Sequence, residues 1–474
     1  MKRREFLRRA GYGSLVALTA SGSAWIHPSC RTGTKRKPNI IFILADDLGY
    51  GDLSCYGQRR FMTPHLDRMA GEGMRFTDHY SGSTVCAPAR CCLMTGYHTG
   101  HARVRGNYGG GPHGWGACLE LRPEDVTIAE ILKKAGYATG AFGKWSLGVA
   151  ETTGAPWKKG IDEWFGYLNQ GRAHFYYPEY LYHNDKKVTL EDNAGGQRRQ
   201  YSHDLIAEKA MEFVAQNKDR PFFLYWAITI PHAEMLVPED SLQEYRGHFP
   251  EKPYVGSHYA SQPEPRAAFA GMVTRMDRDI GRLLKMLEEL GIDQDTIVMF
   301  SSDNGPHREG GHDPEFFDSN GPLRGIKRDL YEGGIRVPLI ARWPEQIQAG
   351  STSSHVSAFW DFLPTACDLA GIPSPEGIDG LSFLPALLGD EKKQQNHEFL
   401  YWEFHERETT DQAARMGRWK GVRHSPTGSI ELYDLENDIG ETTDIAGRNP
   451  VIVNKIRILL DQARTPHEIW ELKS

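Results

Sequence analysis

Apolar runs with little polar alternation recur along the first two thirds of the chain, and a short polar or glycine-rich segment follows each run. The strands expected from this pattern are Asn39–Leu44, Tyr137–Phe142, Pro221–Ile230 and Thr296–Phe300. Strands of this kind are buried on both faces, as in a parallel sheet that helices cover on both sides. The pattern predicts an α/β fold, with a large domain built on a mostly parallel central sheet flanked by helices.

Helical patterns lie between these strands. Thr127-Ile-Ala-Glu130 is a capping box that predicts the start of a helix, and Gly136 predicts its end. A long apolar stripe predicts a second helix over Phe269–Leu290. Ser357–Gly371 is expected to form a helix that still belongs to the large domain. Strands and helices therefore alternate over residues 38–385, as in a doubly wound α/β domain.

The C-terminal part has a different character. Residues 386–397 are polar and charged and are interpreted as a linker. Short strands are expected at Glu398–Phe404, Trp419–Arg423 and Glu431–Leu435, and an amphipathic helix at Val451–Ala463. Short strands followed by one helix predict a small α+β subdomain with an antiparallel sheet over residues 398–474.

Residues 1–30 are interpreted as an export signal, although a basic tail without a targeting role remains an alternative. Arg3-Arg4-Glu-Phe6-Leu7 resembles a twin-arginine signal, which predicts export to the periplasm. The apolar run Gly11–Ala24 is too short and too rich in serine and glycine to span a bilayer, so no transmembrane anchor is expected. Cys30 is a candidate for lipoprotein anchoring, but His27-Pro28-Ser29 is a poor lipobox.

Charge and cysteine content exclude two classes of partner or scaffold. The net charge is −7, and residues 1–30 contain five Lys/Arg and one Glu, so their removal gives −7 − 4 = −11. An acidic chain is a poor partner for nucleic acid. The seven cysteines are scattered and include no Cys-x-x-Cys pair, which argues against a disulfide framework and a cysteine-based metal site.

Chemically useful side chains follow the expected strands. Asp46 and Asp47 follow the first strand, Lys144 and His232 follow the next two, and Asp303-Asn304 follows the last. Ligands of open parallel sheets bind outside the carboxyl ends of the strands, so these side chains are expected to converge there. Oxygen donors suit a hard divalent cation, either Ca²⁺ or Mg²⁺. The pattern predicts a metal site beside an anion site.

A small-residue turn leads into a short helix at Ser83–Gly96. Cys86 is expected at the helix N-terminus, where the helix dipole favours negative charge, and Arg90 lies on the same helix face. One interpretation is an activated thiol nucleophile beside an anion-binding arginine. The other is an inert cysteine at a buried helix start.

Cys86-Ala-Pro88-Ala-Arg90 followed by Thr95-Gly96 resembles the signature of the sulfatase family, within the alkaline-phosphatase superfamily. The resemblance implies that Cys86 is oxidised to Cα-formylglycine by a formylglycine-generating enzyme. It also implies that the hydrated aldehyde attacks the sulfur of a sulfate ester. The metal ligands implied by the resemblance are Asp46, Asp47, Asp303, Asn304 and the modified Cys86, with calcium as the usual ion.

The resemblance extends to four cationic or imidazole side chains. Arg90 and Lys144 match residues that hold the formylglycine and the sulfate. His232 and Lys327 match residues on the leaving-group side, and Lys327 lies in Gly321–Pro338, which is similar to the second long motif of the family. We expect His232 to act as the proton donor to the departing alcohol, with Lys327 as the second candidate.

One position departs from the family pattern. Gly-Lys144-Trp-Ser146-Leu-Gly carries serine where many sulfatases have a histidine that accepts a proton when sulfate leaves. Serine has no comparable basicity, so another group, among them His174, His307 and His312, is expected to take this role, or the step is slow.

Loops are expected to supply the substrate pocket, because such loops carry specificity on a rigid scaffold. The candidate pocket residues are Arg105, Asn107, His174, His307 and His312, together with the aromatic segment 172–180. This mixture suits a sulfated sugar as well as an aryl sulfate. Two other functions remain open: a phosphomonoester or phosphodiester hydrolase of the same superfamily, and a protein that binds sulfated glycans without turnover.

Overall fold

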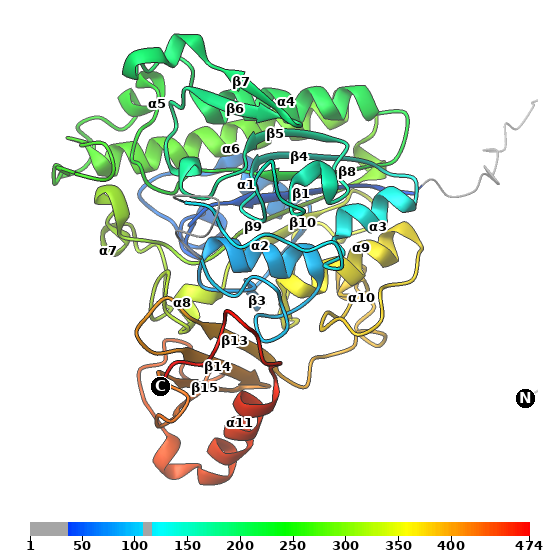
Figure 1. The fold of residues 1–474 in the computed structure, drawn as a ribbon, viewed down its shortest axis with the longest axis vertical. Helices are drawn as coiled ribbons and strands as arrows, with labels where there is room; N and C mark the ends of the chain where they lie inside the picture. Colours follow the sequence, from blue (N-terminus) through cyan, green and yellow to red (C-terminus); the bar gives the residue numbers. More distant parts are fainter. Residues whose placement is uncertain (1–36, 108–115) are drawn as a thin grey trace, which may run out of the picture. The chain divides into compact units, whose positions relative to one another are not determined.

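A ten-stranded mixed sheet runs through the molecule (Figure 1). The computed structural model describes residues 37–107 and 116–474, and Lys37–Ser474 forms one compact unit. In spatial order the strands are β11 (Ser351–Ser353), β2 (Met74–Phe76), β10 (Leu339–Arg342), β9 (Thr296–Ser302), β1 (Asn39–Ala45), β8 (Phe222–Ala227), β4 (Ala138–Lys144), β5 (Glu163–Tyr167), β6 (Tyr180–His183) and β7 (Lys186–Thr189).

The middle of this sheet is parallel, as the sequence predicted. β9, β1, β8, β4 and β5 pair in parallel, whereas β10 and β6 add to the two sides in antiparallel. Helices cover both faces (Figure 1). The helices that precede the C-terminal sheet are α1 (Pro64–Gly71), α2 (Cys86–Thr95), α3 (Ile128–Lys134), α4 (Ser202–Asn217), α5 (Glu239–Gln243), α6 (Pro265–Glu289), α7 (Pro314–Phe317), α8 (Glu332–Ile335), α9 (Phe362–Ala370) and α10 (Leu384–Leu387).

Strand β1 shows why an apolar run without alternation was informative. Ile40 and Phe42 pack into the core beneath α2, α3 and α9, while Ile41 and Ile43 pack into the opposite core beneath α1, α4 and α6. Each of these side chains is essentially inaccessible to solvent. Full burial of one such side chain contributes about 1.5–3 kcal/mol, so the strand stabilises both layers. It also fixes the carboxyl end of β1 at the centre of the sheet.

Several expected boundaries were displaced. The capping box at Thr127 is present and opens α3. The expected helix Ser357–Gly371 begins only at Phe362, because Ser357–Ala358 forms strand β12, which pairs with β3 (His79–Tyr80). Strand β8 ends at Ala227, earlier than expected, and Lys144 is the last residue of β4.

The C-terminal part forms the expected separate antiparallel sheet. Its strands are β13 (Leu400–Phe404), β14 (Asp411–Met416), β15 (Trp419–Arg423) and β16 (Glu431–Asp434), with α11 (Pro450–Gln462) packed on them. Strand β14 was not predicted, because its sequence DQAARM has few of the residues that favour strands. The Trp402 indole donates to Ser81 O at 2.9 Å, so this sheet packs on the loop that precedes α2. The boundaries 38–385 and 398–474 stay a prediction.

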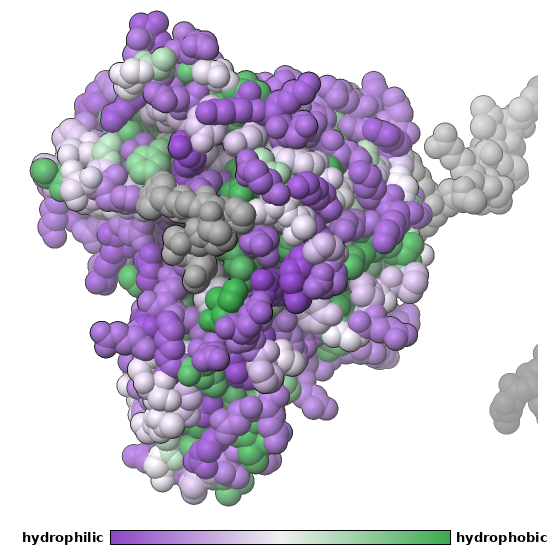
Figure 2. Space-filling view, in the orientation of Figure 1, coloured by the Kyte–Doolittle hydropathy of each residue, from purple (hydrophilic) through white to green (hydrophobic). Residues whose placement is uncertain are grey.

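The export-signal interpretation, including Arg3, Arg4 and Cys30, falls outside the described residues. Within residues 37–107 and 116–474, no helix combines the length and apolar character needed to cross a bilayer. The face in Figure 2 is mostly hydrophilic, with apolar residues scattered among polar ones. Scattered apolar residues are normal on protein surfaces and do not indicate a binding partner.

Candidate active site

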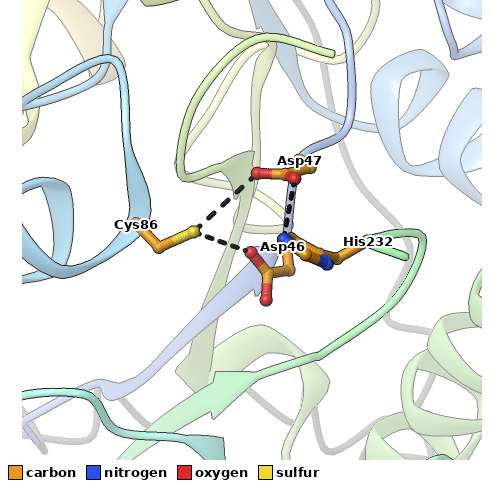
Figure 3. A group of neighbouring side chains, drawn as sticks. All are labelled: Asp46, Asp47, Cys86 and His232. Atoms are coloured by element: carbon orange, nitrogen blue, oxygen red, sulfur yellow. Dashed lines mark hydrogen bonds and ion pairs between the residues drawn. The ribbon is translucent and has the colours of Figure 1, made fainter. Parts of the chain in front are cut away.

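Cys86 is the first residue of α2 and lies beside the carboxyl end of β1. The preceding residue, Val85, has extended backbone, so the chain enters the helix at Cys86 itself. The thiol is fully buried, with Sγ 3.3 Å from Asp46 Oδ1 and 3.8 Å from Asp47 Oδ1. Figure 3 shows Cys86 facing these two carboxylates. The helix start and the strand end therefore meet at one site.

The surroundings of Cys86 keep its thiol protonated. Burial raises the pKa of Cys86 well above its ordinary value, and the carboxylates of Asp303 and Asp46 raise this pKa further. A thiolate nucleophile needs the opposite, a lowered pKa. This direction of the pKa argues against the interpretation of the unmodified Cys86 as an activated thiol. The position suits a residue that is converted to another group before it reacts.

Four oxygen-bearing side chains come together from two neighbouring strands. Asp46 and Asp47 directly follow β1. Asp303 and Asn304 directly follow β9, the parallel neighbour of β1. Asp47 N donates to Asp303 Oδ1 at 3.0 Å, and Asn304 Nδ2 donates to Asp47 Oδ1 at 2.7 Å. Asp47 holds a left-handed φ of 63°, which is costly for a residue other than glycine. The structure thus brings together the four residues expected as metal ligands.

Two cations balance part of this buried negative charge. Arg90 donates to Asp303 Oδ2 through Nε at 3.1 Å and Nη2 at 2.7 Å, and Lys144 Nζ lies 2.7 Å from Asp46 Oδ2. Burial alone would raise the pKa of Asp46, but Lys144, His232 and Arg90 together lower it well below its ordinary value. Asp46 therefore stays ionised in a site that excludes water.

The glycine before Lys144 has a steric reason. Gly143 has a φ of 117°, and a Cβ there would lie 1.8 Å from the carbonyl oxygen of Ala227 on β8. Only glycine allows the two strands to approach this closely. This approach sets the position from which Lys144 reaches Asp46.

Lys327 and His232 form the opposite side of the site. Lys327 Nζ lies 2.7 Å from Asp47 Oδ2 and 2.9 Å from His232 Nε2, and His232 Nε2 lies 3.2 Å from Asp47 Oδ2. Burial and the charge of Lys327 lower the pKa of His232 well below its ordinary value. Burial opposes the charge of Lys327, yet Asp47 and other negative groups raise its pKa well above the ordinary value. A charged lysine thus lies against a neutral imidazole.

The donor set fits a hard divalent cation. Asp46, Asp47, Cys86 and His232 each offer one ligand atom, all within 4.8 Å of one another. The side-chain oxygen of Asn304, Oδ1, is buried and has no hydrogen-bond partner among the described residues. Carboxylate and amide oxygens are the ligands that Ca²⁺ and Mg²⁺ prefer. An orphaned amide oxygen beside several carboxylates is what such a cation would need.

The charges of the buried carboxylates also favour a bound divalent cation. Burial and the charge of Asp46 raise the pKa of Asp303 to about 7, although Arg90 is hydrogen-bonded to the same carboxylate. The protein's own cations therefore do not fully stabilise three neighbouring carboxylates. A divalent cation would supply the missing positive charge.

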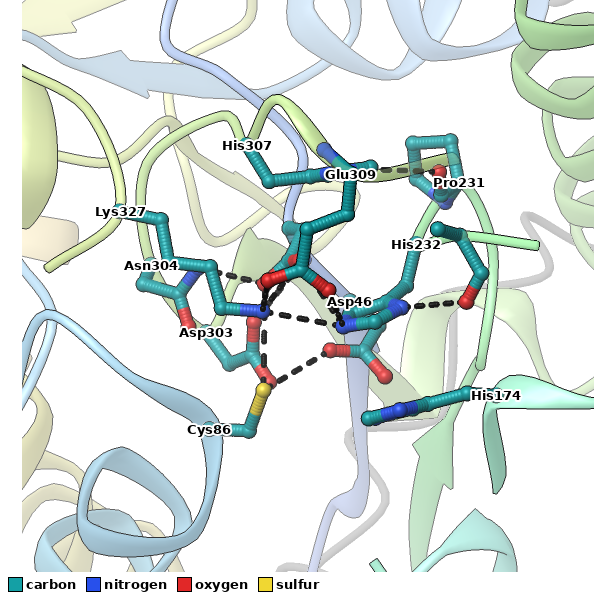
Figure 4. Close-up of polar contacts among 12 residues, drawn as sticks. Asp46, Cys86, His174, Pro231, His232, Asp303, Asn304, His307, Glu309 and Lys327 are labelled. Atoms are coloured by element: carbon teal, nitrogen blue, oxygen red, sulfur yellow. Dashed lines mark hydrogen bonds and ion pairs between the residues drawn. The ribbon is translucent and has the colours of Figure 1, made fainter. Parts of the chain in front are cut away.

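Ser146 does not face the lysine that precedes it by two residues. Its backbone is left-handed, with a φ of 66°, and its hydroxyl donates to Gln170 Oε1 at 2.5 Å. His174 occupies the place beside Lys144 instead: its Nε2 lies 3.4 Å from Lys144 Nζ, and its ring stacks on His232 at 3.8 Å. Figure 4 shows the His174 ring next to the carboxylate of Asp46. Of the three histidines left open by the sequence, His174 has the contact with Lys144.

Two other predicted pocket residues lie around this group. Asn107 Oδ1 accepts from Ala87 N at 3.0 Å, next to Cys86. His307 stacks on His232 at 5.2 Å and accepts from Glu309 N through Nδ1 at 2.9 Å. Both are therefore connected to residues of the site.

Two further predicted pocket residues have other surroundings. Arg105 is buried in an ion pair with Glu403, at 2.9 Å, which makes it a structural contact with β13 instead of a pocket residue. His312 stacks on Phe269 of α6 at 3.9 Å, and its ring nitrogens have no hydrogen-bond partner in the described part of the chain. The expectation for Arg105 was therefore wrong, because the local sequence does not predict the direction of its side chain. The expectation for His312, whose ring lies 5.0 Å from that of His307, stays a prediction.

Sequence reasoning missed Glu309. Its Oε1 pairs with Arg328 at 2.8 Å, and its Oε2 accepts from Tyr259 OH at 2.7 Å and lies 3.9 Å from His232 Nε2. Burial alone would raise the pKa of Glu309, but Lys327 and His232 lower it strongly. The sequence signal that could have identified Glu309 was its place in the same loop as His307, five residues beyond Asn304.

Comparison with known proteins identifies relatives of this arrangement. A family model described as Sulfatase matches residues 38–372, and one described as the C-terminal region of N-sulphoglucosamine sulphohydrolase matches residues 325–464. N-acetylgalactosamine-6-sulfatase of Canis lupus familiaris is 31% identical, over 92% of this chain and 80% of the relative. Human arylsulfatase A is 32% identical, over 90% of this chain and 87% of the relative.

A solved structure agrees with these sequence matches. The crystal structure of Ps i-CgsB in complex with k-i-k-neocarrahexaose aligns with a TM-score of 0.77 and 29% identity. The alignment covers 90% of this chain and 93% of the other. Both the large sheet and the C-terminal sheet therefore have counterparts in one known fold.

Proposed function

Because the chain belongs to the sulfatase family, we propose that it is an exported hydrolase of carbohydrate sulfate esters that uses a formylglycine made from Cys86 and one divalent cation. Its relatives are named sulfatases, and hydrolysis of sulfate esters is the reaction of the family. The observation that carries the proposal is the position of the buried Cys86 between the carboxylates at the ends of β1 and β9.

A carbohydrate is the substrate class that the similarities support. One relative is named for N-acetylgalactosamine 6-sulfate, and a similar solved structure holds a carrageenan-type hexaose. The polar side chains around the site, among them Asn107, Tyr259 and Glu309, suit the hydroxyl groups of a sugar. Aryl sulfates are expected to serve as unnatural substrates.

In this proposal the cation and the formylglycine both lie at the carboxyl end of β1. Asp46, Asp47, Asp303 and Asn304 would hold the cation, Ca²⁺ or Mg²⁺, which would stabilise negative charge beside residue 86. Formylglycine, made by a formylglycine-generating enzyme, supplies a hydrated aldehyde as the nucleophile. The raised pKa of the Cys86 thiol supports the need for this conversion.

The chain's own side chains bind and orient the sulfate. Arg90 and Lys144 present positive charge next to Cys86, on the side where the carboxylates of Asp46 and Asp303 hold them in place. Fixed charges in a dry site stabilise developing negative charge without reorganisation. In this proposal the two cations keep the sulfur in line with residue 86.

Protonation of the leaving alcohol is assigned to the pair of His232 and Lys327. The two side-chain nitrogens lie 2.9 Å apart, and the imidazole is neutral whereas the lysine is charged. Lys327 Nζ is the member of the pair that carries a proton for the departing alcohol, and the neutral Nε2 of His232 accepts from Lys327 and orients it. Glu309, whose carboxylate lies 4.0 Å from Lys327 Nζ, would keep the lysine charged.

Proton removal on the other side is assigned to His174. Burial, the neighbouring His232 imidazole and the charge of Lys144 lower the pKa of His174 well below its ordinary value. The ring is therefore neutral and accepts a proton at a ring nitrogen. In this proposal His174 replaces the histidine that Ser146 lacks.

Export through the twin-arginine route is the proposed localisation step, supported by Arg3-Arg4-Glu-Phe6-Leu7. The folded, already oxidised protein would reach the periplasm. Replacement of Arg3 and Arg4 by lysine should retain the protein in the cytoplasm, and unchanged export of that double variant would contradict the route.

A panel of esters tests the function. It contains 4-nitrophenyl sulfate, 4-nitrophenyl phosphate and 6-sulfated N-acetylgalactosamine, glucosamine and galactose. We expect sulfate release, loss of activity in Cys86→Ala, and activity in the matched control Cys55→Ala, whose thiol lies outside the site. Phosphate release alone would favour a phosphoesterase, and binding of sulfated sugars without turnover by a correctly processed protein would favour a non-catalytic receptor.

A further inference from the structure

A cavity of about 370 Å³ lies at the carboxyl end of β5, the strand next to β4, which ends in Lys144. Among the residues that line it are Glu151, Asn169, Arg172, Tyr180 and Tyr182. Ligand pockets commonly occupy about 300–1,000 Å³, so this cavity has room for one sugar-sized group. None of these residues has a role in the proposed reaction.

The backbone connects this cavity directly to Lys144. Tyr167, the last residue of β5, pairs with Lys144 in the sheet, and its carbonyl accepts from Trp145 N at 3.0 Å. The chain then passes along the cavity and reaches His174, whose Nε2 lies 3.4 Å from Lys144 Nζ. Arg172 precedes His174 by two residues, so their Cα atoms lie at most about 7 Å apart. A molecule in the cavity would be a close neighbour of one at the active site.

Arg172 gives the cavity a positive charge. It begins the single-turn 3₁₀ helix Arg172–His174, its side chain is exposed, and it has no ion-pair partner among the described residues. Its guanidinium carbon lies 4.7 Å from the centroid of the Tyr180 ring. The planar, always charged guanidinium matches the geometry of carboxylate and sulfate groups.

The hairpin of β6 and β7 supplies the aromatic part of the wall. The rings of Tyr180 and Tyr182 lie 5.9 Å apart in an edge-to-face arrangement. Arg172 and Lys187 both lie over the Tyr180 ring, so the Tyr180 hydroxyl and the Tyr182 side chain are the parts that suit a sugar with its hydroxyl groups. The carboxylate of Glu151 adds a hydrogen-bond acceptor for such hydroxyls.

We propose that this cavity is a second carbohydrate subsite, which takes the sugar residue next to the sulfated one and pairs an acidic group of that residue with Arg172. The acidic group is a carboxylate or a second sulfate. The inference rests on the proposed function, since it assumes a sulfated carbohydrate at the active site. It narrows the substrate class to acidic oligosaccharides.

The test compares two oligosaccharides on the full, formylglycine-bearing enzyme. The sugar sulfate that gives the highest kcat/KM in the ester panel is placed in a tetrasaccharide next to a hexuronate. A matched tetrasaccharide carries the same sugar with the hexuronate carboxyl group reduced to an alcohol. We expect the acidic tetrasaccharide to have a KM about tenfold lower, the size expected for one charge-assisted hydrogen-bonded pair.

Variants of Arg172 decide whether this residue is responsible. Arg172→Gln should abolish the KM difference between the two tetrasaccharides, and Arg172→Lys should keep part of it. Arg448→Ala, which removes an exposed arginine of the C-terminal sheet region, should keep all of it. These expectations concern a ratio of two substrates, which a general loss of folding or of catalysis would not change selectively.

Each remaining outcome counts against a specific statement. The comparison is repeated with a neighbouring sugar that carries a 2-sulfate and no carboxyl group, against the same sugar without that sulfate, which separates a carboxylate from a sulfate as the partner of Arg172. Equal KM values within both pairs in the wild type, or a KM difference that survives in Arg172→Gln, overturn the subsite. If no ester in the panel is hydrolysed, the proposed function fails, which is a different result from a failed subsite.

Discussion

The hydroxyl of Ser146 donates its hydrogen to Gln170, and this contact leaves the place beside Lys144 to His174. The serine and the histidine are 28 positions apart in the chain. The loop after β5 brings His174 within 3.4 Å of Lys144. The proposed role of His174 is to replace the histidine that the Gly-Lys-Trp-Ser motif lacks.

Replacement of His174 by alanine should lower kcat for 4-nitrophenyl sulfate by about 100-fold, the lower range for loss of a positioned acid–base group. Ser146→Ala is the matched control and should keep kcat near the wild-type value, because the hydrogen-bond partner of the serine hydroxyl within the described ranges is Gln170. Steady-state kinetics on both purified variants, with circular dichroism to verify folding, measure this. A large loss in Ser146→Ala with none in His174→Ala would reverse the assignment.

Cation binding should stabilise the protein measurably. Calcium at about 100 times its dissociation constant adds about 2.7 kcal/mol to the free energy of unfolding, so the thermal midpoint should rise by several degrees after dialysis against chelator and addition of Ca²⁺. The physical reason is relief of repulsion among Asp46, Asp47 and Asp303. In Asn304→Ala, which removes the orphaned amide oxygen, the shift should shrink.

The control for this experiment is Asn184→Ala, which changes an asparagine outside the site, in the β6–β7 turn. It should keep the full calcium shift. A midpoint that does not respond to Ca²⁺ or Mg²⁺ in the wild type would contradict the metal site, whatever the activity.

Asp52 should make stability depend on pH. Burial raises the pKa of Asp52 from 3.8 to about 8, although Gly49 N donates to its carboxylate at 2.8 Å. Between about pH 4 and pH 8 the folded protein keeps a proton that the unfolded chain has lost. The contribution of Asp52 to stability therefore falls as the pH rises through this window.

Asp52→Asn removes this titration and keeps an acceptor for Gly49 N. The difference in thermal midpoint between the variant and the wild type should become more positive from about pH 5 to about pH 8.5. Asp185→Asn, an exposed aspartate in the β6–β7 turn, should show no such trend. A pH-independent difference for Asp52→Asn would show that the carboxyl group is ionised throughout.

Arg105 should contribute to stability and not to substrate binding. Its guanidinium is buried against Glu403 at 2.9 Å, and Arg464 contacts the same carboxylate at 2.8 Å. Removal of one partner from a buried ion pair costs about 3–5 kcal/mol. Arg105→Met should lower the free energy of unfolding, measured with urea, by about 3 kcal/mol, with KM unchanged. A raised KM at unchanged stability would restore Arg105 to the pocket.

The sequence identified the parts of the site that depend on position along a strand. Asp46 and Asp303 were found because buried strands are visible as apolar runs, and parallel neighbours end at the same edge. The direction of a side chain depends on contacts with distant residues, so the local sequence does not predict it. Whether Arg105 turns toward β13 or toward the substrate depends on Glu403, which lies 298 positions away.

For the same reason, contacts between distant loops could not be predicted from the sequence. The approach of His174 to Lys144 depends on how the segment after β5 folds back, and no periodic pattern marks it. Strand β14 was missed because its burial comes from packing against β13 and β15 and not from an apolar sequence. Tertiary packing decided each of these cases.

The most direct measurement of the central claim is mass spectrometry of the peptide that contains Cys86, taken from enzyme that releases sulfate. The account predicts a residue 86 that has lost one sulfur and two hydrogen atoms, gained one oxygen, and reacts with a hydrazide probe for aldehydes. An active preparation in which residue 86 is entirely an unmodified cysteine would contradict the account.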